Sequence, residues 1–585
     1  MKVPCRKPVI LTIAAAALVG LLGINKTADA QAAKPKIVHD AEYYILDAQH
    51  GEKWKVEDKN LDAKLAELRK KFGTPPNIIH LMWDDQPMGA VGVPALQQIR
   101  GYSTPNLNQM ASEGILFTRM YTEPSCTPSR AASMTGQHPV RNGMYGVGFP
   151  IEYRGLSKRS VTIATALSKA GYATGFYGKW HQGDIEEAYP YNQGFDEALF
   201  GVYNQVSSLY SPQGETAGAV IGLKEEVLAK DRYQLDNKFN QKGYVLYIEG
   251  KKGEKGKEWG ATQTPQDFMA LDTESEKRAV AFMRRSAADK KPFYVAWWPM
   301  FSPFFPSPPP RVSLQRGLLG EAYEKMLDPA AGRLMAFLKA QGLAENTLVV
   351  AMADNGPMTH NPPAASGLGE GPFRGGKGDF LEGGVRVVAQ AWWPGMIKPG
   401  QTVGDIVHIT DLYTTFANIG GATQHLPTDR VIDGIDQTAL LLKGDSFSRR
   451  DYVFIYTGPI LAATVKKQYK RHWLGGEGAS SGIPAAFYDL YNDHREHTPL
   501  LLQMLHFKEP FNRMRARHEL WKKKYPDQPA GAGPAFTGLS NARPETIALS
   551  RPPVDMKNLP FNVLEYIQYL DQLPFDRNAE PDLGR

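Results

Sequence analysis

One isolated cysteine stands in a stretch that is typical of the start of a helix. Cys126 is one of two cysteines in the 585-residue chain, and the other, Cys5, lies close to the N-terminus. Pro128 suits the first turn of a helix and Gly136 suits its end, so Cys126 is expected at a helix N-terminus. A thiol there, beside Arg130, is predicted to have a lowered pKa and to be reactive. The alternative is a buried structural thiol, and spacing alone does not decide between the two.

Two acidic pairs have the chemistry of a divalent-cation site. Asp84-Asp85 and Asp354-Asn355 each come directly after an apolar run of strand length. Carboxylate and amide oxygens are hard ligands of the kind that Ca²⁺ and Mg²⁺ prefer. Each pair taken alone is more often a helix cap or a turn, because Asp and Asn are common at both.

Three basic side chains could act on an anion. Lys179 and His181 lie two positions apart, beyond another apolar run. Lys377 stands in the glycine-rich stretch 375–378, where a flexible turn could direct its ammonium group towards an anion. Taken singly, the first two fit a solvated loop and the third fits a surface hairpin.

Most of these side chains must be positioned by a sheet, because they follow predicted strands. Apolar runs of strand length alternate with segments of helical spacing, which favours an α/β fold with a mostly parallel central sheet sandwiched by helices. Ligands of such sheets bind beyond the carboxyl ends of the strands, so Asp84, Lys179 and Asp354 are expected at one edge. The predicted strands are 77–83, 115–117, 172–177, 293–298 and 347–353, and the predicted helices are 61–72, 104–111, 161–170, 272–286 and 321–341.

The character of the chain changes near residue 449. Short antiparallel strands are predicted at 451–456, 464–469 and 487–490, and a basic helix is predicted near 511–524. The predicted divisions are a signal peptide at 1–30, an N-terminal arm at 31–73, a catalytic domain at 74–448, a smaller C-terminal antiparallel-sheet subdomain at 449–510, and a C-terminal helix and tail at 511–585.

The first thirty residues have the three parts of a secretory signal. Lys2, Arg6 and Lys7 precede an apolar run, and Ala28-Asp29-Ala30 provides a small-x-small cleavage site. The alternative is a membrane anchor, but the run is short for a span. Cleavage would lower the net charge from +6 to +3, which does not indicate a nucleic-acid partner. The mature protein is therefore predicted to be exported, periplasmic or secreted, without a stable membrane anchor.

The cysteine stretch resembles a known family signature. Cys126-Thr127-Pro128-Ser129-Arg130 with Thr135-Gly136 is similar to the signature of the formylglycine-dependent sulfatases, arylsulfatase-like members of the alkaline-phosphatase superfamily. The resemblance covers roughly residues 74–500. Supporting motifs follow in the family's order: Pro76-Asn77-Ile78-Ile79 with Asp84-Asp85, Thr104-Pro105-Asn106-Leu107, Gly178-Lys179-Trp180-His181, Asp354-Asn355-Gly356, Gly376-Lys377-Gly378 with Glu382-Gly383-Gly384, and Leu490-Tyr491-Asn492-Asp493.

The resemblance implies a modified nucleophile and a metal. A formylglycine-generating enzyme would oxidise Cys126 during maturation, and the hydrate of the resulting aldehyde would attack a sulfate monoester of a small molecule or a sugar. The cation, usually Ca²⁺ and otherwise Mg²⁺, polarises the sulfate oxygens. The implied metal ligands are Asp84, Asp85, Asp354, Asn355 and the modified Cys126.

The resemblance also implies roles for the basic residues. Arg130, Lys179 and Lys377 would neutralise charge on the transferring group. His181 would orient or deprotonate the second hydroxyl of the hydrate.

One family feature is missing. The family usually has a further His after the strand at 293–298, whereas this chain reads Trp297-Trp298-Pro299-Met300-Phe301-Ser302-Pro303. Activity is expected to persist, either because His360 or His408 substitutes or because the leaving group needs little protonation. Trp297, Trp298, Phe301, Phe304 and Phe305 suggest an apolar or ring-stacking wall for the substrate, with ordinary packing as the alternative.

Two other functions fit the same residues. A phosphonate monoester or phosphodiester hydrolase would keep the fold and the nucleophile and would change the bond that is cleaved. A non-catalytic anion-binding relative would explain the missing His.

Overall fold

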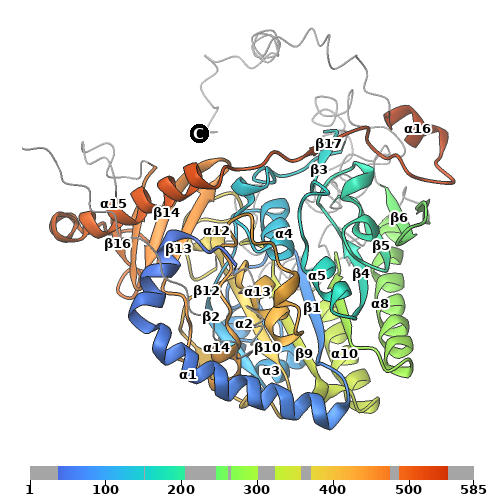
Figure 1. Cartoon of the computed structure of the whole chain (residues 1–585), viewed down its shortest axis with the longest axis horizontal. Coiled ribbons are helices and arrows are strands. Elements are labelled where there is room, and N and C mark those ends of the chain that lie inside the picture. The colour runs from blue at the N-terminus through green and yellow to red at the C-terminus, as the bar shows by residue number, and fades with distance from the viewer. Residues whose placement is uncertain are drawn as a thin grey trace, which may run out of the picture. The chain divides into compact units, whose positions relative to one another are not determined.

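The computed structural model describes residues 37–150, 152–203, 246–260, 265–300, 323–357, 371–474 and 486–550 (Figure 1). A large sheet lies between two layers of helices, and the C-terminal part adds a small antiparallel sheet. The predicted fold class is therefore confirmed. None of the helices in the described residues combines the length and the apolar character that a membrane span requires.

The large sheet is built around parallel strands. Its strands are β1 Asn77–Trp83, β2 Ile115–Tyr121, β4 Ala173–Lys179, β5 Glu197–Gly201, β6 Tyr247–Lys251, β7 Lys257–Glu258, β8 Phe293–Trp298, β9 Thr347–Ala353, β10 Arg386–Trp392, β11 Gln401–Val403 and β12 Val407–His408. They lie in the order β11-β2-β10-β9-β1-β8-β4-β5-β6-β7, and β12 also pairs with β2. The adjacent strands from β9 to β5 are parallel, and β1, β8 and β9 are buried along their whole length. Their continuous apolar sequences are typical of strands covered on both faces.

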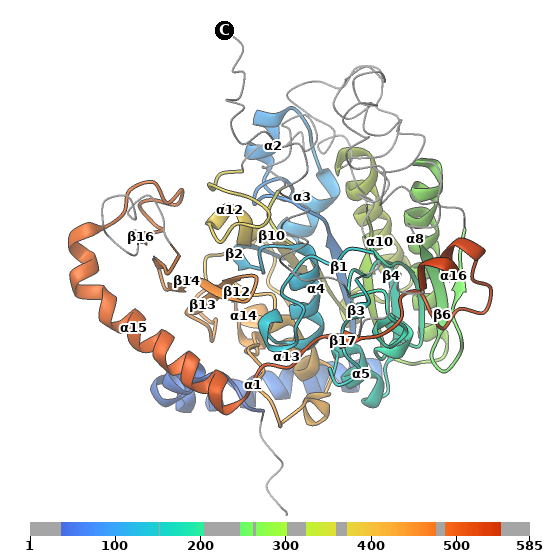
Figure 2. The same cartoon turned by 90° about the horizontal axis from the view of Figure 1, so that it is seen from above.

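Helices cover both faces of this sheet (Figure 2). One layer contains α3 Pro105–Ser112, α8 Pro265–Ala288 and α10 Asp328–Ala340, and the other contains α4 Cys126–Thr135, α5 Ile163–Lys169 and α13 Asp411–Ile419. The predicted helix 321–341 is α10 preceded by a π-turn at Tyr323–Leu327. The remaining α-helices of the described residues are α1 Ala41–Phe72, α2 Pro94–Arg100, α12 Glu382–Val385, α14 Thr438–Lys443, α15 Leu501–Lys524 and α16 Pro544–Ser550.

Helix α1 is longer than its sequence pattern indicates. It begins after Asp40, whose carboxylate caps the first turn, rather than at Leu61. It ends before Gly73, whose φ of 74° is easily adopted by glycine. Leu61, Leu65 and Leu68 are buried as predicted. The first half of the helix is highly charged and was not recognised because its apolar contacts come from distant parts of the chain.

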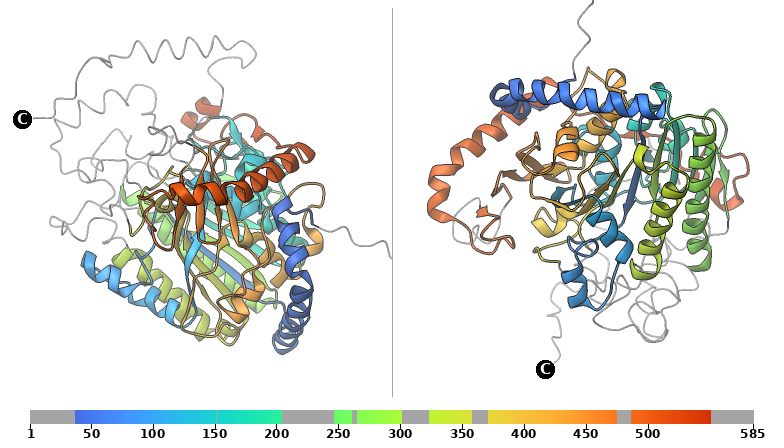
Figure 3. Two further views of the ribbon diagram at one scale, coloured as in Figure 1. Left: turned by 90° about the vertical axis from the view of Figure 1, so that its left-hand side faces the viewer. Right: turned by 90° about the horizontal axis from the view of Figure 1, so that it is seen from below.

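The small sheet has four strands where three were predicted, because a turn separates two strands near residue 467. Its antiparallel order is β13 Tyr452–Thr457, β14 Ile460–Lys466, β15 Tyr469–His472 and β16 Phe487–Asp489. The predicted strand 464–469 is wrong, because the chain turns at Lys467, whose φ is 55°. Helix α15 crosses the outside of this sheet (Figure 3) and begins at Leu501 rather than near 511.

A buried ion cluster joins the small sheet to the large one. Lys470 of β15 lies 3.1 Å from Glu382 Oε1 and 2.9 Å from Glu496 Oε1, and all three side chains are fully buried. Glu496 also accepts a hydrogen bond from the backbone N–H of Glu382 at 2.7 Å, and Tyr121 donates to Glu382 at 2.9 Å. The cluster therefore holds the start of α12, which directly follows the loop that carries Lys377.

Removing the cation of this cluster is expected to destabilise the protein. In Lys470→Met, two buried carboxylates lose their shared partner, which typically costs about 3–5 kcal/mol of unfolding free energy. Thermal unfolding followed by circular dichroism measures the change. Lys466→Met is the matched control on the neighbouring strand, because Lys466 is 24% exposed and its buried partner Glu42 keeps a second ion pair with Arg517. The remaining pair of Lys466, with the partly exposed Asp451, is worth about 1 kcal/mol or less. Equal shifts in the two variants would contradict the expectation.

Candidate active site

Cys126 is the first residue of α4, as its sequence context predicts. Strand β2 leads through 122–125 into the helix, and Ser125 is the residue that precedes its first turn. The thiol is fully buried at the edge of the sheet where the central strands end. The predicted lowered pKa is wrong. Burial raises the pKa of the Cys126 thiol to about 11, and the nearby ammonium groups of Lys179 and Lys377 only partly offset this effect. An unmodified Cys126 is thus a protonated, inert thiol.

The two acidic pairs meet beside this thiol because their strands are neighbours. β1 and β9 are parallel and in register, with Trp83 opposite Ala353, so the residues that follow them are adjacent. The backbone N–H of Asp85 donates to Asp354 Oδ1 at 3.1 Å, and Asn355 Nδ2 donates to Asp85 Oδ1 at 2.8 Å. The Asp85 backbone has a φ of 54°, a conformation unusual for a residue other than glycine and often associated with functional sites.

This group of oxygens fits a hard divalent cation. Ligand atoms of Asp85, Cys126 and Asp354 lie within 4.8 Å of one another. Asn355 Oδ1 is buried and has no hydrogen-bond partner among the described residues, as expected of an oxygen that binds an ion. The Cys126 sulfur marks the position that the oxygens of a modified residue would take. Oxygen-rich sites of this kind favour Ca²⁺ or Mg²⁺ over softer metals.

Arg130 donates hydrogen bonds to the carboxylates of Asp84 and Asp354. Its guanidinium donates to Asp354 Oδ2 from Nε at 3.1 Å and from Nη2 at 2.8 Å, and it also donates to Asp84. Nη1 donates to the backbone carbonyl of Lys179 at 2.8 Å. The side chain is completely buried, with its guanidinium 5.0 Å from the ring centroid of Trp298. Arg130 therefore holds the Asp84 and Asp354 carboxylates in place rather than facing an open pocket.

Trp297 and Trp298 do not form a substrate wall. Trp297 is 2% exposed and Trp298 is 0% exposed, so both belong to the core, and Trp298 lies against Arg130. Packing, which was the alternative interpretation, is correct for these two residues. Phe301, Phe304 and Phe305 lie outside the described residues.

Lys179 ends β4 and reaches the first acidic pair. Its ammonium donates to Asp84 Oδ2 at 2.6 Å. Burial would raise the pKa of Asp84, but Lys179 and Arg130 outweigh burial and hold that pKa below its usual value. The preceding Gly178 has a φ of 115°, and a Cβ there would lie 1.9 Å from the Trp298 carbonyl oxygen. Glycine is therefore required for β4 to bring Lys179 to this position.

Lys377 reaches the thiol from the opposite direction. Its Nζ lies 2.8 Å from Cys126 Sγ, and 2.8 Å and 3.0 Å from the two carboxylate oxygens of Asp85. The loop is anchored where the backbone N–H of Gly378 donates to the Pro124 carbonyl at 2.7 Å. Burial opposes the charge of Lys377, but the Asp85 carboxylate outweighs burial and holds the pKa of Lys377 well above its usual range. The ammonium therefore stays charged at neutral pH.

His181 is neutral and has one free ring nitrogen. Its Nε2 donates to the Gly148 carbonyl at 2.9 Å, while its Nδ1 is buried and has no hydrogen-bond partner in the part of the chain that the structure describes. Burial and the charge of Lys179 hold the pKa of His181 well below its usual value. A neutral imidazole with a free lone pair can accept a proton.

The match to a family model decides the family. The model described as Sulfatase matches residues 76–316 and 319–422, which is more than half of the chain. The chain belongs to the sulfatase family. Its relatives are sulfuric ester hydrolases, and the chain is an enzyme of this class.

Several named sulfatases are similar to this one along most of their length. N-acetylgalactosamine-6-sulfatase of Homo sapiens is 33% identical over 413 residues, covering 68% of this chain and 72% of the relative. Steryl-sulfatase of Rattus norvegicus is 30% identical and covers 71% and 77%. The solved structure of PsFucS1 sulfatase from Pseudoalteromonas sp. has a TM-score of 0.68 and 30% identity, and covers 81% of this chain and 96% of its own.

In this sulfatase, His408 contacts Glu123 and Thr410 rather than the Cys126 thiol. His408 is buried in a second cluster, where its Nε2 lies 3.9 Å from Glu123 Oε1 and its Nδ1 lies 2.8 Å from Thr410 Oγ1. His138 Nδ1 lies 2.7 Å from the same Glu123 oxygen. No sequence signal indicated this cluster, because His408 is far along the chain from Glu123 and His138. His360, the other predicted substitute, lies outside the described residues.

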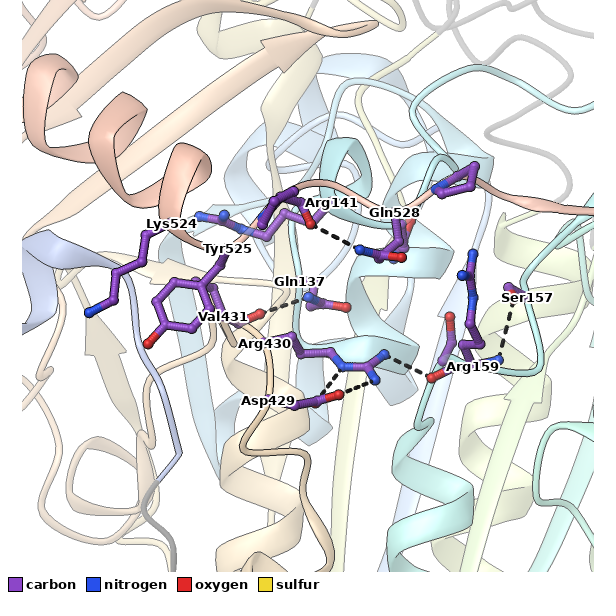
Figure 4. Close-up of a pocket in the computed structure, with 14 residues that line it drawn as sticks. Gln137, Arg141, Ser157, Arg159, Asp429, Arg430, Val431, Lys524, Tyr525 and Gln528 are labelled. Carbon is purple, nitrogen blue, oxygen red and sulfur yellow. Dashed lines mark hydrogen bonds and ion pairs between the residues drawn. The ribbon is translucent and has the colours of Figure 1, made fainter.

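A polar pocket of about 290 Å³ lies near the opposite end of α4 (Figure 4). None of the predicted catalytic residues lines it. Its Arg430 is already satisfied by Asp429 at 2.8 Å and by the Arg159 carbonyl at 2.8 Å, and Gln137 donates to the Val431 carbonyl at 2.7 Å. The pocket is therefore separate from the sulfatase centre.

Proposed function

We propose that this sulfatase hydrolyses a sulfate monoester with a formylglycine hydrate derived from Cys126 and a divalent cation, Ca²⁺ or Mg²⁺. The observation that carries the proposal is the convergence of Lys377, Asp85 and Asp354 on the Cys126 sulfur. A buried thiol with a raised pKa gains a function if it is the precursor of another group. The carboxylates and ammonium groups around it are those that an attacking oxygen and a sulfate would need.

The metal and the basic residues have separate tasks in this proposal. Asp84, Asp85, Asp354 and Asn355 would hold the cation with the modified Cys126, and Arg130 keeps two of the carboxylates in place. The cation supplies Lewis-acid polarisation of a sulfate oxygen and favours a deprotonated nucleophile.

Protein side chains perform the remaining steps. The charged ammonium of Lys377 would stabilise the negative charge on the sulfate as it transfers, with Lys179 assisting through Asp84. After one hydroxyl of the hydrate has taken the sulfate and the alcohol has left, His181 would take the proton of the second hydroxyl at its Nδ1. The aldehyde C=O bond would then re-form as the C–O bond to the sulfate breaks, which releases sulfate.

The substrate class is an alcohol sulfate, of a small molecule or a sugar. The similar proteins are named for N-acetylgalactosamine 6-sulfate, steryl sulfate and aryl sulfate.

Export through a cleaved leader and maturation by a formylglycine-generating enzyme belong to the same proposal. Residues 1–36, which contain the predicted leader, lie outside the described residues.

Mass spectrometry of the Cys126 peptide, combined with turnover of a panel of esters, tests this function. Loss of sulfur with gain of an aldehyde, and hydrolysis of 4-nitrophenyl sulfate or a sugar sulfate, are expected. Faster hydrolysis of a phosphodiester or phosphonate monoester than of any sulfate would favour the alternative bond. An intact thiol in fully active protein would overturn the proposal, and an intact thiol in inactive protein from the native host would favour an anion-binding relative.

Removal of the cation is expected to lower activity reversibly. Dialysis against EDTA should reduce kcat by at least about 10²-fold, because oriented charge stabilisation of that size is lost with the ion. Readdition of Ca²⁺ or of Mg²⁺ in separate samples should identify the ion that restores turnover. Lasting full activity after dialysis, with less than one equivalent of metal by elemental analysis, would contradict the metal site.

A further inference from the structure

The outer face of α15 carries an excess of positive charge that the catalytic centre does not use. Residues 501–524 contain seven Lys or Arg residues and two Glu residues. Among the cations, Lys508, Arg513, Arg515, Lys523 and Lys524 are exposed. Arg517 pairs with Glu42 and Lys522 pairs with Asp527, but the described residues contain no ion-pair partner for the five exposed cations. We call these five residues the α15 basic face.

The helix is fixed in place by its opposite side. Phe511, Met514 and His518 are buried against the small sheet and the N-terminal helix. His518 lies 2.8 Å from Asp40 Oδ2 and 2.5 Å from the Tyr456 hydroxyl. The α15 basic face is therefore a rigid feature, and from Lys508 to Lys524 it extends about 24 Å at 1.5 Å per residue.

A second observation extends this cationic surface to the neighbouring strand β15. Arg471 of β15 and Arg515 of α15 both lie over the ring of Trp473, at 4.1 Å and 4.9 Å from its centroid. Burial and the positive charge of Arg515 both lower the pKa of Arg471. Arg471 donates hydrogen bonds to Asn512 and to the Lys508 carbonyl, but its Nε is buried and has no partner among the residues that the structure describes. An anion bound beside Arg471 and Arg515 would offset this unfavourable electrostatic interaction.

We propose that the α15 basic face, extended by Arg471, is a docking surface for a sulfated polysaccharide chain. The proposal rests on the proposed function, since it adds that the sulfate ester belongs to a polyanionic saccharide. Charge complementarity supplies the attraction, and the row of cations matches a chain with repeated sulfate groups. Figure 4 shows the Lys524 side chain pointing away from the other labelled pocket residues.

A lipid surface fits this face less well. Helices that lie in a membrane interface present an apolar face to the lipid. Phe511 and Met514 of α15 are buried in the protein, and Leu520 is a single large hydrophobic side chain of the described part of α15 that is exposed, at 62%. Anionic vesicles are therefore the competing ligand in the test.

The test compares two charge-matched variants of the full-length protein. In the first, Arg513, Arg515 and Lys523 are replaced by glutamine, and in the second Lys55, Lys59 and Lys70 on the exposed side of α1 are replaced by glutamine. Dissociation constants are measured for dextran sulfate, for neutral dextran and for phosphatidylglycerol vesicles at low and moderate salt. Hydrolysis of 4-nitrophenyl sulfate and the midpoint of thermal unfolding are measured in parallel.

The first variant should bind dextran sulfate at least tenfold more weakly, while the α1 variant changes less than twofold. Neutral dextran should not bind, affinity should fall with salt, and 4-nitrophenyl sulfate turnover should remain unchanged. Equal weakening in both variants, or loss of vesicle binding with dextran sulfate binding intact, would overturn the proposal. Binding and turnover are separate readouts, so a protein that binds dextran sulfate but hydrolyses no sulfate ester would overturn the proposed function alone.

Discussion

Cys126→Ala protein is expected to fold normally and to lose sulfate ester hydrolysis by a factor of at least about 10⁴. Removal of a covalent nucleophile typically has effects of this size or larger. The substitution removes one buried sulfur from a helix start, so the midpoint of thermal unfolding should change little. Initial rates with 4-nitrophenyl sulfate, compared with those of the wild-type protein, measure the loss.

Wild-type protein made without a formylglycine-generating enzyme is the matched control. It keeps the thiol, whose raised pKa of about 11 leaves it protonated at neutral pH, so it should be as inactive as the alanine variant. Turnover near the wild-type rate in either sample would show that another group is the nucleophile.

Lys377→Met should lower kcat by about 10²–10³-fold while leaving the fold intact. The Lys377 ammonium lies 2.8 Å from Cys126 Sγ and keeps its charge, so it is available to stabilise charge that develops on the sulfate. Loss of one oriented donor to a developing anion typically has an effect of this size. Steady-state kinetics separate this change in kcat from a change in KM.

The exposed Lys398→Met is the control for loss of a lysine outside the site and should keep wild-type kinetics. Because Lys377 also pairs with Asp85, metal content has to be measured in the same samples. A Lys377→Met enzyme with wild-type kcat and full metal content would remove Lys377 from the mechanism.

The central strands were predictable because they depend on local sequence. The runs 77–83, 293–298 and 347–353 are strands with the predicted bounds, since a continuous apolar run between polar turns has few other ways to be buried. The first half of α1 and the turn at Lys467 were not predictable in this way. Both depend on contacts between residues far apart in the chain.

The features of the candidate site also fall into those that the sequence indicated and those that only the tertiary structure showed. The sequence alone identified the residue types and their order: Cys126 at a helix start, an acidic pair after each of two strands, and Lys179 and Lys377 nearby. Because the carboxyl ends of parallel strands meet at one edge of a sheet, the polar residues that follow these strands are expected to lie together there. The tertiary structure was needed to show that Arg130 supports the carboxylates and that Trp298 belongs to the core.

The state of Cys126 shows why the two sources of information differ. A helix N-terminus and a neighbouring arginine are local features, and they predicted a reactive thiol. Burial is a property of the whole fold, and desolvation of the thiolate outweighs the nearby positive charges. Sequence therefore determined which residues are present and in what order. Only tertiary packing decided which of them stay charged, which are neutral and which are enclosed, because solvent exclusion depends on segments distant in the chain.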